Sequence, residues 1–189
     1  MSKQFWSEVI ASQVAAGTLF NTYTTAKTVI NPTALVSLPP NYLYPGSQLR
    51  VTVLGGISNV VTAQPTFTFQ VMMGSIIVHT SGAILTTTTA HTLIPFKYVV
   101  DLRCDTIGNG TVAKFLAQGV LQGIMFVISG AVADPTAGVA TIMCPNTAPA
   151  VGTGFDSTIA NILDFWVGIS VSLSTNGIQV YEYTAEALN

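Results

Sequence analysis

Residues 96–105 read FKYVVDLRCD, and this stretch decides the fold class. Every second residue from Phe96 to Cys104 is apolar, and three of the residues between them are charged. Because successive side chains of a strand point to opposite faces, this period of two predicts a strand with one buried face. An α-helix would need a period of 3.6 residues, which this stretch lacks. The same alternation occurs in residues 48–53, 66–73 and 165–173.

Residues that favour turns separate these segments. They are Pro39-Pro40, Tyr44-Pro45-Gly46, Gly55-Gly56, Gly108-Asn109-Gly110 and Asn176-Gly177. The Asn-Gly pair supplies the positive φ angles that a tight hairpin needs, so we expect residues 165–174 and 178–184 to form a hairpin closed at residues 175–177.

Many strands joined by short turns predict an all-β jelly-roll sandwich of about eight strands in two sheets, over residues 36–189. Residues 1–35 are rich in Ala and Thr and lack a clear apolar face until Thr28. We expect them to form an extended N-terminal arm or an edge strand, with a local helix at Phe5–Ala16 as the alternative.

The composition indicates a surface that partners cover. Hydrophobic residues make up 49% of the chain and charged residues only 7%, against roughly 25% in an ordinary soluble domain. We therefore expect a homo-oligomer. The net charge is −2, and the six Lys and Arg residues are scattered, which argues against nucleic-acid binding. The start, MSKQFWSEV, has no apolar segment after its Lys and does not resemble a signal peptide, so we expect assembly in a reducing cytoplasm.

A run of 19 uncharged residues, 115–133, allows two interpretations. Its length suits a membrane-spanning helix, but Gln118, Gln122 and three glycines argue against one, and no Lys or Arg cluster flanks it. We expect no membrane contact and instead predict, over residues 115–128, a strand buried on both faces at or near a subunit interface. One face carries Leu116, Val120, Ile124, Phe126 and Ile128. The predicted interface face carries Phe115, Ala117, Gly119, Leu121, Gly123, Met125 and Val127.

A search for chemistry finds no catalytic or cofactor-binding motif. The two histidines, His79 and His91, could join one metal ion with a carboxylate, but neither lies in a ligand motif. Cys104 and Cys144 form no CxxC pair and are expected in the core. Arg103, between Asp101 and Asp105, suggests a local surface ion pair. We therefore expect no enzyme activity, no cofactor and no metal.

The order of features along residues 29–188 resembles a class of small bacteriophage virion proteins with a single jelly roll, which decorate the capsid or are minor capsid proteins. The segments that carry this resemblance are LVSLP (35–39), YPGSQLRV (44–51), GGIS (55–58), PTFTF (65–69), VDLRC (100–104), GNGT (108–111), FDST (155–158) and residues 166–173. The resemblance implies a virion protein, a trimer and contact with the major capsid protein of the same virion.

Three alternatives remain open. The first is a receptor- or glycan-binding head of a phage fibre, which exposed aromatic side chains near loops would favour. The candidates are Trp6, Tyr42, Tyr44, Tyr181 and Tyr183. The second is the main shell protein of a single-jelly-roll capsid. The third is a cupin-like enzyme, against which the lack of a histidine cluster argues.

Overall fold

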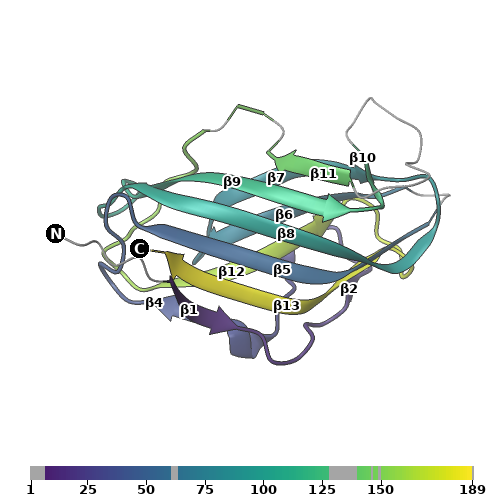
Figure 1. The fold of residues 1–189 in the computed structure, drawn as a ribbon, viewed down its shortest axis with the longest axis horizontal. Coiled ribbons are helices and arrows are strands. Elements are labelled where there is room, and N and C mark those ends of the chain that lie inside the picture. Colours follow the sequence, from purple (N-terminus) through teal and green to yellow (C-terminus); the bar gives the residue numbers. More distant parts are fainter. Residues whose placement is uncertain (1–6, 61–63, 128–139, 146, 149, 189) are drawn as a thin grey trace.

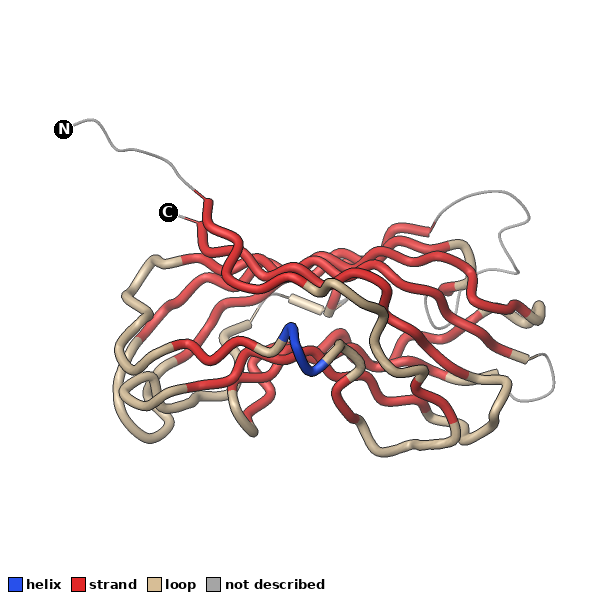
Figure 2. Tube along the Cα trace, turned by 90° about the horizontal axis from the view of Figure 1, so that it is seen from below, coloured by secondary structure: helices blue, strands red, loops and turns tan. Residues whose placement is uncertain are grey.

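The computed structural model is a sandwich of two antiparallel β-sheets packed face to face (Figure 1, Figure 2). It describes residues 7–60, 64–127, 140–145, 147–148 and 150–188. The seven-stranded sheet has the order β1 (Ser7–Ser12), β13 (Gly177–Leu188), β5 (Gln48–Asn59), β8 (His91–Thr106), β9 (Lys114–Gly123), β11 (Ala140–Cys144), with β2 (Phe20–Asn21) also paired to β13. The six-stranded sheet has the order β10 (Phe126–Val127), β7 (Ile76–Thr86), β6 (Thr66–Met73), β12 (Asn161–Ile169), β3 (Lys27–Thr28), with β4 (Val36–Leu38) also paired to β12.

This architecture confirms the predicted all-β, jelly-roll-like sandwich. Seven of the strands in the described part have eight or more residues, and the others are short edge pieces of two to six residues. The only helical element described is a single 3-10 turn, Pro32–Ala34. No described helix is long and apolar enough to cross a membrane.

The alternating residues fill the space between the sheets. Val53, Tyr98, Leu121 and Tyr183 lie directly opposite one another across four strands of the seven-stranded sheet, and all four are fully buried. Phe69 of the six-stranded sheet meets this row, with its ring centroid 5.1 Å from that of Tyr98. Burying one such side chain stabilises the fold by roughly 1.5–3 kcal/mol, so the period-two pattern is the main determinant of the fold.

The predicted hairpin over residues 165–184 is wrong. β12 ends at Ile169 in the six-stranded sheet, and β13 begins at Gly177 in the seven-stranded sheet. A turn does form before Gly177, since the N–H of Asn176 donates to the carbonyl of Leu173 at 3.0 Å. The Asn-Gly pair therefore predicted the turn, while the seven residues 170–176 carry the chain from one sheet to the other.

The predicted single strand over residues 115–128 is also wrong. β9 ends at Gly123, Ile124 and Met125 form a turn, and β10 belongs to the opposite sheet. Only one face of β9 is fully buried. The other face has exposed side chains at Lys114 and Gln122 and half-buried ones between them, so it is an outer surface of the sandwich.

Residues 7–35 pack onto the sandwich as edge elements. β1 pairs with the end of β13, from Ser7 opposite Leu188 to Ser12 opposite Thr184, and no helix forms within the described part of Phe5–Ala16. The Gln13 side chain donates to the carbonyl of Val180 at 3.0 Å and accepts from the N–H of Asn31 at 2.9 Å. Between Gln13 and Asn31, the buried Val29 and Ile30 belong to the core of the sandwich. The edge-strand interpretation therefore describes this segment better than a free arm.

Candidate functional site

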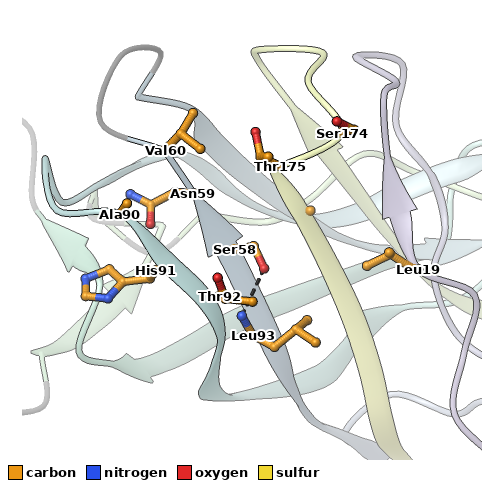
Figure 3. Close-up of a pocket in the computed structure, with 11 residues that line it drawn as sticks. Leu19, Ser58, Asn59, Val60, Ala90, His91, Thr92, Leu93, Ser174 and Thr175 are labelled. Atoms are coloured by element: carbon orange, nitrogen blue, oxygen red, sulfur yellow. Dashed lines mark hydrogen bonds between the residues drawn. The ribbon is translucent and has the colours of Figure 1, made fainter.

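A pocket lies where β5 ends and where β8 and β13 begin (Figure 3). Its volume is about 380 Å³, which is within the usual range for small-ligand sites. The residues that line it are Leu19, Ser58, Asn59, Val60, Ala90, His91, Thr92, Leu93, Ser174, Thr175 and Gly177. We call this the end pocket.

A β-bulge shapes one wall of the end pocket. The pairing of β5 with β8 shifts between Ile57 and Asn59, and Leu93 has a φ angle of 49°. This left-handed backbone is uncommon for a leucine and costs roughly 1 kcal/mol or more unless the surroundings hold it. Ser58 Oγ accepts from the N–H of Leu93 at 2.9 Å. Gly56 leaves room for the bulge, since a Cβ there would lie 3.0 Å from the carbonyl oxygen of Leu93.

Two buried asparagines hold the chain segments beside the end pocket in place. Asn59 Nδ2 donates to the carbonyl of Thr87 at 2.8 Å, and Asn176 Oδ1 accepts from the N–H of Val60 at 3.1 Å. Both side chains are essentially inaccessible to solvent. Because buried amides with hydrogen-bond partners hold a single orientation, the pocket is formed before any ligand arrives.

The end pocket has no acidic or strongly basic side chain among the described residues that line it. Lys, Arg, Asp and Glu are absent from this lining, and His91 is its one titratable residue. Ser58, Thr92 and Thr175 bring hydroxyl groups, and Leu19 and Leu93 are partly exposed apolar side chains. Such a lining suits a neutral ligand that has both hydroxyl groups and C–H faces, as a sugar ring does.

The predicted interface residues lie in the interior of the sandwich. Phe115, Ala117, Gly119, Leu121, Gly123 and Met125 are all buried by the chain's own core. They offer no surface to a partner, which corrects the prediction of a subunit interface on this face. Val127, the remaining residue of that face, lies in β10 and pairs with Leu85 of β7. Ile128 lies outside the described residues.

The glycine at position 119 makes room for a side-chain pair. A Cβ there would lie 2.7 Å from Tyr98 Oη and 3.1 Å from His79 Nε2. Those two atoms are hydrogen-bonded at 2.7 Å, and burial lowers the pKa of His79 to about 4. His79 is therefore a neutral core residue at physiological pH.

The two histidines do not converge. His79 is inside the core, whereas His91 lines the end pocket. Among the described residues, no three His, Cys, Asp or Glu side chains gather as metal ligands would. The absence of a metal and of a cofactor remains a prediction.

The aromatic candidates divide into exposed and buried side chains. Tyr44 and Tyr181 are about half exposed, Tyr42 is half-buried and Tyr183 is fully buried. Trp6 lies outside the described residues. None of the described candidates lines the end pocket. Sequence reasoning missed Ser58 and Leu93, for which the only signal was the loss of alternation in residues 91–95.

The charged residues singled out from the sequence form surface pairs. Arg103 lies 3.7 Å from Asp105, as the spacing suggested. Asp101 instead pairs with Arg50 across the β5–β8 ladder, at 2.7 Å, and this bond raises the pKa of Arg50. Both pairs are exposed, so each contributes little to stability.

Comparison with known proteins gives one structural similarity to report. No family model matches the chain, and no curated protein matches it. Among solved structures, the fold is similar to that of the CBM2 module of the evolved Dit of Lactobacillus casei BL23 phage J-1. The TM-score is 0.42 and the sequence identity 11%, over 99% of this chain and 98% of that chain. At this level of similarity, no residue correspondence or function is transferred.

Proposed function

We propose that this chain is a structural component of a bacteriophage virion, assembled in the host cytoplasm, that binds a receptor or glycan and catalyses no reaction. The observation that carries the proposal is the hydroxyl-lined end pocket, whose described lining has two partly exposed leucines and no Lys, Arg, Asp or Glu. A charged ligand would lose its hydration there without gaining an ionic partner, whereas a neutral sugar can exchange water for hydroxyl groups and apolar contacts.

The size of the end pocket limits the size of the ligand that it can hold. A volume of about 380 Å³ holds one or two sugar rings and not a long chain, so the ligand is the end of a neutral glycan. The bulge at Leu93 supports this role, because a strained backbone conformation that the surroundings hold in place is typical of functional sites.

Truncation of Leu93 tests the proposal. We expect Leu93→Ala to weaken binding of a neutral saccharide at least tenfold, because it removes one apolar wall. Leu173→Ala is the matched control, since Leu173 is exposed to nearly the same extent and does not line the pocket. Calorimetric titration with glucose, galactose, mannose, N-acetylglucosamine and their short neutral oligomers measures the effect. No binding of any of these by the wild type, or equal loss in both variants, would contradict the proposal.

Capsid decoration is the second candidate, and the shortage of charge favours it. With only 7% charged residues, much of the surface suits burial against other subunits. In this role the chain is a homo-oligomer, a trimer by its resemblance, that binds the major capsid protein of its virion through protein–protein contacts. Co-sedimentation of the purified chain with phage heads that lack it is the test, and stoichiometric binding to heads with no saccharide binding would establish this role instead.

A further inference from the structure

The two outer faces of the sandwich differ sharply in charge. On the seven-stranded sheet, side chains that alternate with the buried ones point outward, and eight of these are ionised. They are Arg50, Lys97, Asp101, Arg103, Asp105, Lys114, Glu182 and Glu186. Figure 1 looks onto this sheet, with β13, β5, β8 and β9 in front.

The described outer face of the six-stranded sheet exposes uncharged residues. One cross-strand row contains Thr28, Trp166, Gln70 and Thr80, and the next contains Gly168, Thr68 and Ala83. These rows alternate with the inward rows of Val167 with Phe69 and of Phe165 with Val71, so they face away from the core. We call this surface the neutral face.

The described strands of this sheet contain one lysine and one acidic residue, and both leave the neutral face without an exposed charge. Lys27 pairs with Val167 and so belongs to an inward row at the sheet edge, where its Nζ lies 3.6 Å from the centroid of the Tyr23 ring. Asp164 is in an outward row but is only 8% exposed. It accepts from Thr28 Oγ1 at 2.8 Å, Trp166 Nε1 at 2.6 Å and its neighbour's N–H at 2.7 Å.

The Asp164 carboxylate holds Trp166 in place. Its hydrogen bond satisfies the indole N–H, so the half-buried ring is fixed on the neutral face and has no unpaired donor to bury. Trp is enriched at the centres of protein interfaces, and Lys, Glu and Asp are depleted there. In the part of the chain that the structure describes, the neutral face has both properties and the opposite outer face has neither.

We infer that the neutral face is the surface through which copies of this chain associate. Burial of the charged outer face would desolvate eight ions, whereas burial of the described neutral face desolvates none that is exposed. The occupant is a second copy because an uncharged face meets no like-charge repulsion when it packs against itself, and it offers no ionic group to select a charged partner.

The size of the neutral face fits this role. Strands β7, β6 and β12 with the short β3 and β4 beside them span about 20 Å across and about 30 Å along, at roughly 4.8 Å per strand and 3.3 Å per residue. The resulting planar area of about 600 Å² approaches the roughly 800 Å² that each partner buries in a stable complex. This inference rests on the oligomer proposed above, but its test does not depend on saccharide binding.

A pair of matched threonines tests the inference. Thr68 lies in the middle of β6 on the neutral face, and Thr52 lies in the middle of β5 on the charged face; both are half-buried. We expect Thr68→Glu to raise the dissociation constant of the oligomer at least about 100-fold, because an unpaired carboxylate would be buried at the interface. Thr52→Glu should leave the dissociation constant within about threefold of the wild type. Sedimentation velocity from 1 to 100 µM measures both.

Three other outcomes of these measurements would contradict the inference. A monomeric wild type across this range overturns the inference, as does an oligomer that Thr68→Glu leaves intact or that Thr52→Glu dissociates equally. Circular dichroism and thermal unfolding check that Thr68→Glu is folded. If it is not, Thr80→Glu, in the same face but more exposed, replaces it with the same expected dissociation. Saccharide binding by a folded, dissociated Thr68→Glu protein would separate this surface from the end pocket.

Discussion

Single residues in the core decide the details that the sequence pattern leaves open. Gly119 leaves room on the inner face of β9 for the Tyr98–His79 hydrogen bond. A glycine within an apolar strand indicates that some other group approaches the backbone closely. The identity of the approaching group could not be predicted, because β7 and β8 bring it from residues 79 and 98, and no local pattern links those positions to 119.

Protonation of His79 should destabilise the fold in mild acid. Its pKa is about 4 in the folded chain and 6.5 in the unfolded chain, so the unfolded state binds a proton first as the pH falls. The stability from neutral His79 is complete above pH 6.5 and is lost between pH 6.5 and 4, by roughly 3 kcal/mol. Urea unfolding at pH 7 and pH 4.5 measures the loss.

The comparison with His79→Gln isolates this effect from other titrating groups. Gln keeps a hydrogen-bonding group near Tyr98 but does not titrate. The variant is expected to be less stable than the wild type at pH 7 and to lose clearly less unfolding free energy on acidification. Parallel losses in the two proteins would show that His79 is not the responsible group.

At the scale of the strand, sequence patterns predicted where a strand forms and which face it buries. They did not predict which strands pair with one another. The alternation in residues 96–105 identified the buried face of β8 correctly, because a half-buried strand must alternate wherever it lies. The assignment of β12 and β13 to one hairpin failed because turn residues specify a change of direction and not the sheet that the next strand joins. In β9, Gln118 and Gln122 already marked an outer face, and the apolar residues between them obscured it.

Adjacent residues of β9 should respond differently to a charge. Leu121 is fully buried in the core, and Val120 is half-buried on the outer face. We expect Leu121→Asp to cost at least about 4 kcal/mol and to abolish folding, since it buries an unpaired carboxylate. Val120→Asp should cost about 1 kcal/mol, mainly from lost strand propensity. Chemical unfolding of both variants is the measurement, and similar losses would contradict the assignment of faces.

The whole molecule is asymmetric in a way that composition alone could not reveal. The sequence predicted a shortage of surface charge but not its location, because the strands of each sheet are scattered along the chain. Among the described residues, pairing places eight ionised side chains on one outer face and no exposed one on the neutral face. The end pocket could not be predicted from the sequence either, because residues 19, 58, 93 and 177 come together only when the sandwich forms.

This asymmetry predicts how salt affects association. Screening weakens interactions between exposed charges, and the Debye length falls from about 10 Å at 0.1 M to about 3 Å at 1 M. Copies that associate through the neutral face have no ion pairs to screen, so their dissociation constant should change less than about threefold between 0.05 and 1 M NaCl. Association through the opposite face would involve Arg50, Asp101 and their neighbours, and 1 M NaCl would then weaken it at least tenfold. Sedimentation equilibrium at the two salt concentrations distinguishes these results. Sodium sulfate, which strengthens apolar burial, should tighten the oligomer if the neutral face is the interface.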